Sequence, residues 1–253
     1  MVDPITRHEL YRSPQEEDVR GKFIRHFREC PIPDNELLSN LGLFLNSKNL
    51  SRILYMDHLY RQILETPGVL IEFGTRWGQN LSLFAALRGI YDPFERNRKI
   101  IGFDTFSGFI AVTNKDAKDH EIINAGGFGV TKDYEKYLED VMNFQEMDNP
   151  MSHVKKFDVR KGDASVEIVE YLKQYPETIV ALAFFDMDVY EPTKKCLQII
   201  KPHLVKGSVL AFDELNDHDS PGETTALNEV FGLNYLRLKR FSRSSRTGYF
   251  VKE

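Results

Sequence analysis

Residues 69–78, VLIEFGTRWG, decide the fold, because a short apolar run leads there directly into a loop with two glycines. An apolar run of this length, with Glu72 as its one polar member, is typical of a strand buried on both faces of a sheet. A helical pattern from Ser51 leads into the run and stops at TPG, residues 66–68, and a second helical pattern follows at 80–88. This succession predicts an α/β fold.

Four further apolar runs predict strands, at residues 100–103, 154–159, 179–185 and 208–212. Helical patterns alternate with the later runs, at residues 165–174 and 193–203. Strands that alternate with helices form right-handed βαβ units around a buried parallel sheet. The last two segments, 235–241 and 248–252, alternate between apolar and polar residues and predict an antiparallel pair that ends the sheet.

The composition is that of a folded globular protein, since 42% of the 253 residues are hydrophobic and 28% are charged. The longest apolar run, 179–185, is far below the roughly 18 residues of a membrane span. The first twenty residues lack the apolar segment of a secretory signal, so we expect a cytoplasmic protein without a membrane partner. Cys30 and Cys196 have no zinc-type spacing and are expected to be small buried side chains.

The formal net charge of −5 argues against nucleic acid as a partner. Basic residues are concentrated in one segment, at Arg237, Lys239, Arg240, Arg243 and Arg246. Apolar and basic residues alternate in its LRLKRF portion, which favours an edge strand with a solvated basic face. A phosphate-binding surface is the alternative.

The chain is expected to have two parts, a partly helical N-terminal extension over residues 1–50 and an α/β domain over residues 51–253. About 45 residues follow the strand that ends at Asp104, which is more than a βαβ crossover needs. Residues 110–153 of this connection, with GGFG at 126–129, form either a mobile lid over a ligand crevice or a subunit contact. The sequence leaves the oligomeric state open, a homo-oligomer included.

Ligands of open α/β sheets bind beyond the carboxyl ends of the strands, where this sequence has acidic residues and glycines. The first loop has only Gly74 and Gly78, so it lacks the GxGxxG of a dinucleotide site, and an acid, Glu72, stands near the strand end. A carboxylate there suits the ammonium and sulfonium groups of S-adenosylmethionine, whereas a pyrophosphate prefers bare amides. Gly74 would let the cofactor approach the backbone, and Gly78 would allow tight helix packing.

Two more acids follow predicted strands. Asp104 is placed to accept hydrogen bonds from both ribose hydroxyls, or else forms a turn in DTFSG. Asp163 would meet the adenine amino group, or would cap the helix that starts near Ala164. Together with Glu72, these acids at successive strand ends predict a site for S-adenosylmethionine.

The sequence resembles the class I S-adenosylmethionine-dependent methyltransferases, and more narrowly the macrocin O-methyltransferase family, which modifies sugars in natural products. The resemblance is carried by the strings IEFGTRWGQN, GFDTFSGF, KGDASV, FFDMDVYEPTKKCL and GSVLAFDELN. It implies a Rossmann-like seven-stranded sheet, mostly parallel with an antiparallel terminal strand, with helices on both faces and the cofactor over the first two strands. It departs at residues 213–214, where that family usually has two aspartates.

The resemblance assigns Asp186, Asp213 and Glu214 to catalysis and to a divalent metal such as Mg²⁺. The ends of neighbouring strands would bring these carboxylates together, and clustered oxygen ligands suit a hard ion. Without a cation they would repel one another, and no lysine or arginine lies within five residues of them in the sequence. Asp188 would support the site, face solvent or cap the following helix.

These features predict methyl transfer from S-adenosylmethionine to a hydroxyl of a small polar acceptor, sugar-like or another natural product, with metal assistance. The alternatives are an N-methyltransferase for a small amine or guanidine and a nucleotide-binding module without turnover. No spacing selects His120, His153 or His218 as a general base, and each is expected to be exposed and idle. Residues 213–223, DELNDHDSPGE, are alternatively a separate metal loop.

Overall fold

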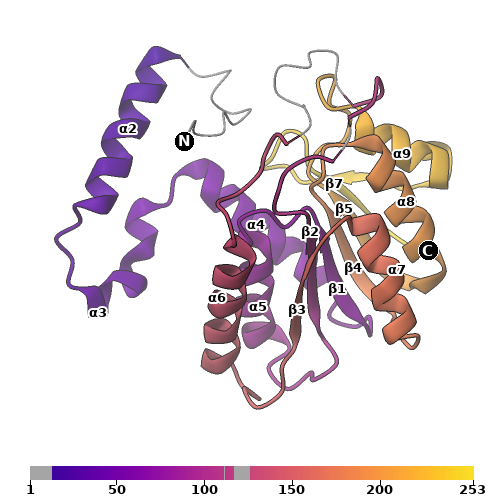
Figure 1. Cartoon of the computed structure of the whole chain (residues 1–253), viewed down its shortest axis with the longest axis horizontal. Coiled ribbons are helices and arrows are strands. Elements are labelled where there is room, and N and C mark those ends of the chain that lie inside the picture. Colours follow the sequence, from indigo (N-terminus) through magenta and orange to yellow (C-terminus); the bar gives the residue numbers. More distant parts are fainter. Residues whose placement is uncertain (1–12, 111, 117–125) are drawn as a thin grey trace.

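The computed structural model describes residues 13–110, 112–116 and 126–253 and contains a seven-stranded sheet (Figure 1). The strand order is β3-β2-β1-β4-β5-β7-β6. The strands are β1 (Val69–Phe73), β2 (Ile100–Asp104), β3 (Phe157–Lys161), β4 (Val180–Phe185), β5 (Leu204–Phe212), β6 (Lys239–Arg240) and β7 (Gly248–Val251). Neighbours from β3 to β5 are parallel, and β7 is antiparallel to both β5 and β6. The predicted fold class is confirmed.

Three predicted strands have clearly different bounds. β5 begins at Leu204, four residues before the expected start at residue 208. β3 begins at Phe157 instead of residue 154, because residues 151–154 form a turn. Met151 has a left-handed φ of 60°, and the amide of Val154 donates a hydrogen bond to the carbonyl of Met151. The strand expected over residues 235–241 is reduced to Lys239–Arg240, since a 3₁₀ turn occupies Leu233–Tyr235 and β7 offers only four residues for pairing.

Helices cover both faces of the sheet (Figure 1). One face carries α4 (Ser47–Gln62), α5 (Gln79–Tyr91) and α6 (Tyr134–Asp148), and the other carries α7 (Ala164–Gln174), α8 (Tyr190–Ile200) and α9 (Gly222–Phe231). Successive strand residues alternate between the two cores: Ile71 and Phe73 belong to the core under α7, α8 and α9, and Leu70 to the core under α4, α5 and α6. Cys196 is buried in the first core, as expected, whereas Cys30 is only half-buried; both are free thiols.

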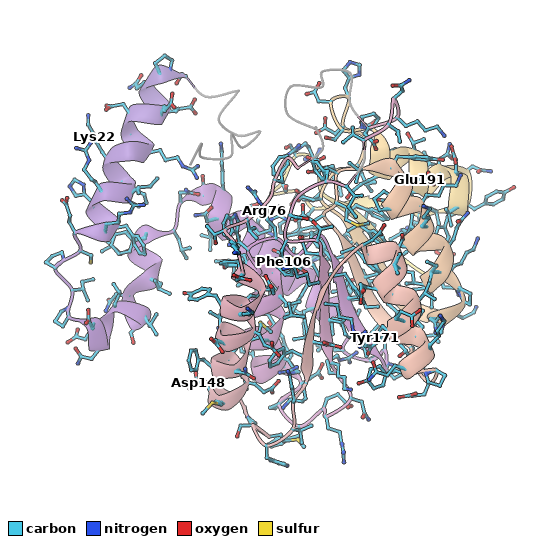
Figure 2. All side chains as sticks on the ribbon, viewed as in Figure 1. Lys22, Arg76, Phe106, Asp148, Tyr171 and Glu191 are labelled. Atoms are coloured by element: carbon cyan, nitrogen blue, oxygen red, sulfur yellow. The ribbon has the colours of Figure 1, made fainter. Side chains whose placement is uncertain are left out.

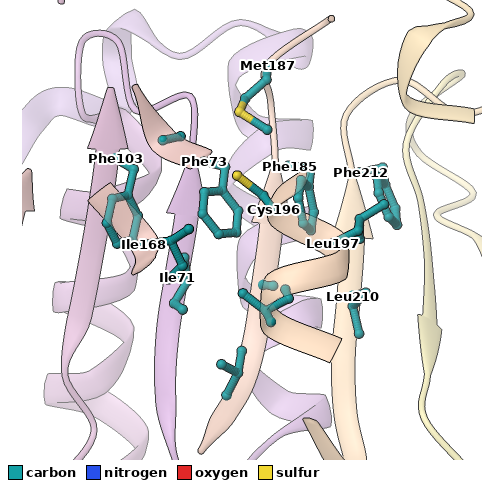
Figure 3. Packing of buried hydrophobic residues seen from close by; sticks show 14 of the residues in the cluster. Ile71, Phe73, Phe103, Ile168, Phe185, Met187, Cys196, Leu197, Leu210 and Phe212 are labelled. Carbon is teal, nitrogen blue, oxygen red and sulfur yellow. The ribbon is translucent and has the colours of Figure 1, made fainter. Parts of the chain in front are cut away.

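Four phenylalanines at or next to the ends of four strands form a row across the carboxyl edge of the sheet (Figure 3). The ring centroids of Phe73 lie 5.4 Å from Phe103 and 4.9 Å from Phe185, and Phe185 lies 5.1 Å from Phe212. The same residues are partners in the strand register. The four strands therefore end at the same level of the sheet edge. An acid directly follows three of the four phenylalanines.

Helix α6 lies within the expected lid, residues 110–153, but it is built into one face of the fold. Its Leu138 and Met142 are buried in the core shared with α5. The Glu146 carboxylate lies 2.9 Å from Arg88 Nη2 and 2.5 Å from Lys156 Nζ, and all three side chains are buried. Residue 111 and residues 117–125 lie outside the described residues, so a lid remains a prediction for the part of the connection before α6.

The described part of the N-terminal extension consists of α2 (Pro14–Arg28), α3 (Asp34–Leu37) and a 3₁₀ segment, Leu38–Phe44. Figure 1 shows this unit standing apart from the sheet, and Figure 2 labels Lys22 on it. The boundary expected after residue 50 falls inside α4, which begins at Ser47. Among the described residues, no helix is both long and apolar enough to cross a membrane.

Candidate active site

A cavity of about 1110 Å³ lies at the carboxyl ends of the strands. Figure 2 shows Arg76 and Glu191, which both line it, at this end of the molecule, with Asp148 and Tyr171 toward the opposite end. The loops after β1, β2, β3, β4 and β5 all contribute to its wall. The place predicted for the ligands is therefore where the structure has its large cavity.

Both glycines of the first loop have a left-handed φ and no room for a side chain. A Cβ on Gly74, at a φ of 90°, would lie 2.0 Å from the carbonyl oxygen of Asp186. A Cβ on Gly78, at a φ of 74°, would lie 2.2 Å from Cδ1 of Leu138 on α6. Gly78 thus allows close helix packing, as predicted, and Gly74 brings the first loop against the loop after β4.

Glu72 is deeper than the prediction implied. Its side chain is 1% exposed and is absent from the cavity wall, whereas its partner Asn80 lines the cavity. Asn80 Nδ2 donates a hydrogen bond of 2.8 Å to Glu72 Oε1. Burial raises the pKa of Glu72 to about 8. In this conformation, Glu72 therefore acts on the cavity through Asn80 and not by direct contact.

Asp104 lines the cavity and also ties two loops together. Its Oδ2 accepts a hydrogen bond of 2.7 Å from the amide of Arg76, and its Oδ1 accepts one of 2.6 Å from the amide of Phe106. Burial raises its pKa, and these two backbone hydrogen bonds partly offset that effect. The turn-forming role considered for Asp104 is present, and the carboxylate still faces the ligand space.

Asp163 caps α7, as one of its two interpretations proposed. Its Oδ1 accepts hydrogen bonds of 2.8 Å from the amide and 2.7 Å from the hydroxyl of Ser165. Asp163 also lines the cavity, next to Gly162. Capping and contact with a ligand are thus compatible, because only Oδ1 makes the cap.

The structure brings Asp186, Asp213 and Glu214 together at the cavity wall. Arg52 of α4 lies between two of them, with Nη2 2.9 Å from Asp213 Oδ1 and Nη1 3.6 Å from Asp186 Oδ2. Arg246 contacts the Glu214 carboxylate and lies 3.0 Å from Asp217 Oδ2. The positive charge that these acids require therefore comes, in this structure, from arginines distant in sequence.

Two carboxylates of this group, Asp186 and Asp188, have raised pKa values. Burial, followed by the charge of Asp213, raises the pKa of Asp186 to about 8. Burial raises the pKa of Asp188 well above its ordinary value, and a hydrogen bond with Glu214 adds to this rise. Asp188 lines the cavity with a left-handed φ of 59°, and its hydrogen bond with Glu214 places it beside the acidic group.

Glu223 on α9 is a further acid beside this group, which the sequence analysis considered only as the last residue of the alternative metal loop, 213–223. Its side chain is fully buried, and its carboxylate accepts hydrogen bonds from the amides of Met187, at 3.1 Å, and Glu214, at 3.3 Å. It therefore joins the loops that follow β4 and β5. No sequence signal indicates that Glu223 is buried, because a glutamate within an amphipathic helix ordinarily faces solvent.

The histidines are placed as expected where they are described. His153 is exposed just before β3, at the amino ends of the strands, and His218 is exposed in the loop before α9. His120 lies outside the described residues. The described part of the cavity wall contains no histidine.

The basic segment departs from its edge-strand interpretation. Only Lys239–Arg240 forms a strand, and these residues are exposed. Arg243 and Arg246 line the cavity, together with Ser244, Ser245 and Thr247, in the segment that turns after Phe241 and leads into β7.

Comparison with known proteins agrees with this geometry. No family model and no curated protein matches the sequence. A structure of CalS11, a calicheamicin methyltransferase, is 40% identical, with a TM-score of 0.92, over 95% of this chain and 94% of that one. The chain belongs to the class I S-adenosylmethionine-dependent methyltransferases.

Two more structures extend this result. An apo structure of CalS11, described as a TDP-rhamnose 3′-O-methyltransferase in calicheamicin biosynthesis, is 38% identical over 95% of this chain and 96% of that one, with a TM-score of 0.84. The O-methyltransferase NovP is 14% identical over 80% of this methyltransferase and 79% of its own chain, with a TM-score of 0.55, and shares the fold. The predicted family is confirmed.

Proposed function

We propose that this methyltransferase transfers the methyl group of S-adenosylmethionine to a hydroxyl of a nucleotide-activated sugar, as a step in natural-product biosynthesis. The observation that carries the proposal is its 40% identity over nearly the whole chain with CalS11, which acts on TDP-rhamnose. The cavity of about 1110 Å³ supports it, because single-ligand pockets are typically about 300–1,000 Å³. The cavity thus has room for a cofactor and a second ligand.

The cofactor end is proposed to be the wall formed by Gly74, Asp104 and Asp163. Each oxygen of Asp104 accepts one backbone hydrogen bond and keeps a lone pair for a ribose hydroxyl. Asp163 uses only Oδ1 for its cap, which leaves Oδ2 for the adenine amino group. Glu72 contributes through Asn80, and Gly78 contributes by letting α5 start against α6.

The acceptor end is proposed to be the acidic group Asp186, Asp213 and Glu214, which adjoins the cofactor end because Gly74 contacts the backbone of Asp186. Methyl transfer forms a bond from the acceptor oxygen to the methyl carbon as the carbon–sulfur bond breaks, so both groups must be held in line. The acceptor proton passes to one of the carboxylates of this acidic group.

We further propose that Asp186, Asp213 and Glu214 hold a divalent cation such as Mg²⁺. The donor set fits, since these are carboxylate oxygens at one wall of one cavity. Within the described residues no group of acids, histidines or cysteines is already arranged for a metal, and Arg52 and Arg246 contact Asp213 and Glu214 in this structure. When bound, the cation would stabilise the negative charge that develops on the acceptor oxygen.

The function is tested by incubating the enzyme with S-adenosylmethionine and TDP-rhamnose. We expect S-adenosylhomocysteine to form and NMR of the product to place the methyl group on a sugar oxygen. Methylation of a small amine in place of the sugar would contradict O-methylation. Tight NAD binding without any response to S-adenosylmethionine would contradict the cofactor assignment.

The metal is tested separately, by exhaustive chelation and by titration with Mn²⁺ followed by electron paramagnetic resonance. Asp186→Asn should lose Mn²⁺ binding and turnover but keep its affinity for S-adenosylhomocysteine, whereas Asp140→Asn on the exposed part of α6 should keep all three. Full turnover after chelation would reject the metal. The carboxylates would then be better explained as a site for a cationic acceptor.

A further inference from the structure

The cavity continues past the acidic group to the first turn of α4. Ser47, Lys48 and Asn49 line it there, after the N-cap residue Asn46, whose side chain accepts a hydrogen bond of 2.9 Å from the amide of Asn49. The first turn of a helix carries amides without partners in the helix and a partial positive charge. Helix α4 has 16 residues, and its first turn lines the cavity, so this partial positive charge lies at the cavity wall.

A second segment, residues 243–247, lines the cavity beside this helix. Ser51 Oγ of α4 donates a hydrogen bond of 2.6 Å to the carbonyl of Arg243, which holds the segment against the helix. Arg243 itself packs its guanidinium 5.6 Å from the Phe241 ring centroid. All five residues of the segment line the cavity. Two cationic side chains from distant parts of the sequence, Lys48 and Arg243, thus border one space.

The two cations beside the acidic group and the two cations near the start of α4 differ in their partners. Arg52 and Arg246 are paired with Asp213 and Glu214, as described above. Neither Lys48 nor Arg243 has an acidic partner within the described part of the chain. Of the other acids that line the cavity, Glu16, Asp217 and Asp219 all have interactions, and Asp217 is bonded to Arg246. Lys48 and Arg243 are therefore available for an anion, which the carboxylates of Asp186, Asp213 and Glu214 would repel.

Thr247 gives an independent indication of a ligand. It is 6% exposed and lines the same cavity, yet its Oγ1 is buried without a hydrogen-bond partner among the described residues. Buried hydroxyls are nearly always satisfied, so an exception at a cavity wall points to a polar group that binds there. Thr247 is also contiguous with Arg246 and lies next to Gly248, whose carbonyl is bonded to Tyr55 of α4.

The spacing matches a sugar phosphate. Lys48, Arg52 and Tyr55 follow one another at intervals of four and three residues, so they share one face of α4, and all line the cavity. The helix rise puts Lys48 about 6 Å along the axis from Arg52, which contacts the acidic group. That separation is comparable to the width of a pyranose ring.

We propose that the first turn of α4, Lys48, Arg243 and Thr247 form a subsite for the diphosphate of a nucleotide-activated sugar. This inference rests on the proposed function and deepens it, because it places the sugar hydroxyl at the acidic group and the anomeric phosphate one ring away. Lys48 and Arg243 contact phosphate oxygens, and the Thr247 hydroxyl donates to one of them. An uncharged glycoside would leave both cations without a partner.

The test is calorimetric titration of thymidine diphosphate into enzyme saturated with S-adenosylhomocysteine. We expect Arg243→Gln and Lys48→Gln each to weaken binding about tenfold, the effect of losing one charge-assisted hydrogen bond. Arg240→Gln, on exposed β6 and away from the cavity, should leave the affinity unchanged. Wild-type binding should weaken as salt increases, and affinity for S-adenosylhomocysteine, which reports correct folding, should be the same in every variant.

Thr247→Val separates a ligand role from a structural one. Because the hydroxyl has no partner in the described protein, the variant should unfold at the same temperature or higher, yet bind thymidine diphosphate more weakly. A lower unfolding temperature with unchanged thymidine diphosphate affinity would assign Thr247 to the fold alone and overturn its part in the subsite.

Other outcomes distinguish the subsite from the proposed function. Equal thymidine diphosphate affinity in wild type, Arg243→Gln and Lys48→Gln would overturn the subsite and leave the activity intact. Methylation of a free glycoside by a wild-type enzyme that does not bind thymidine diphosphate would overturn the subsite and the acceptor class but keep the cofactor. Failure to bind S-adenosylhomocysteine would overturn the proposed function itself.

Discussion

Arg52 of α4 lies 2.9 Å from the carboxylate of Asp213 and so joins the first helix of the α/β domain to the end of β5. Its other terminal nitrogen lies 3.6 Å from Asp186. Burial lowers the pKa of Arg52, but Asp213 and Asp186 more than offset this and raise it above its ordinary value. Arg52 therefore stays charged and occupies the place where a divalent cation would neutralise the same two carboxylates.

Replacing Arg52 should strengthen cation binding. We expect Arg52→Gln to bind Mn²⁺ about five to ten times more tightly, because the cation no longer competes with a guanidinium for Asp186 and Asp213. The measurement is Mn²⁺ titration in the presence of S-adenosylhomocysteine. Arg61→Gln, at the exposed end of α4, is the matched control and should not change the affinity. Weaker Mn²⁺ binding in Arg52→Gln would show that Arg52 supports the cation site and does not compete with it.

Asp104 should contribute directly to cofactor affinity. Asp104→Ala removes a carboxylate that faces the cavity and holds the amides of Arg76 and Phe106, so binding of S-adenosylhomocysteine should weaken by about 1–3 kcal/mol. Asp104→Asn keeps one acceptor oxygen and should lose less. Calorimetry on both variants checks the order. Equal affinity in Asp104→Ala and wild type would exclude Asp104 from the cofactor site.

Glu72 should make the free protein less stable as pH rises. Its pKa is raised from 4.5 to about 8, so between these values the folded chain keeps a proton that the unfolded chain has lost. Glu72→Gln keeps the hydrogen bond with Asn80 and does not titrate. The variant should match wild type near pH 4 and exceed its free energy of unfolding by roughly 2–4 kcal/mol above pH 8. Urea denaturation across this range provides the measurement, and a difference that does not change with pH would refute the shift.

Gly78 should be intolerant of a side chain. Gly78→Ala would place a Cβ 2.2 Å from Leu138 in a left-handed backbone conformation, and we expect a loss of about 1–3 kcal/mol in stability. Gly21→Ala in α2, where the structure has open space, should instead gain roughly 0.5–1 kcal/mol. Thermal denaturation of both variants tests the contrast. Equal effects would mean that α6 moves away from Gly78 at little cost.

Local patterns in the sequence were sufficient for the strands and for the acids that follow them. Residues 69–73 and 179–185 are apolar runs, and a parallel sheet buries such runs on both faces. Because the carboxyl ends of parallel strands share one edge, Asp186, Asp213 and Glu214 were expected to converge, and all three line one cavity. The weakly patterned start of β3 and the two-residue β6 were misplaced, since pairing with β2 and β7 decides them.

The partners of those acids could not be predicted from the sequence. Arg52 and Glu223 lie in helices, where a charged residue ordinarily faces solvent, and only packing against the sheet turns them inward. Arg243 and Arg246 follow the LRLKRF pattern that predicted an edge strand, and no periodicity indicated that they would line the cavity.

The sequence by itself thus determined the class of fold, the edge of the sheet that carries the site and the acids of that edge, because these depend on periodicity and on the position of residues along single strands. The tertiary structure decided which charges those acids meet, that Glu72 is buried and bonded to Asn80, and that residues 243–247 line the cavity with α4. Such contacts join residues as far apart as Arg52 and Asp213, and short-range patterns carry no information about them.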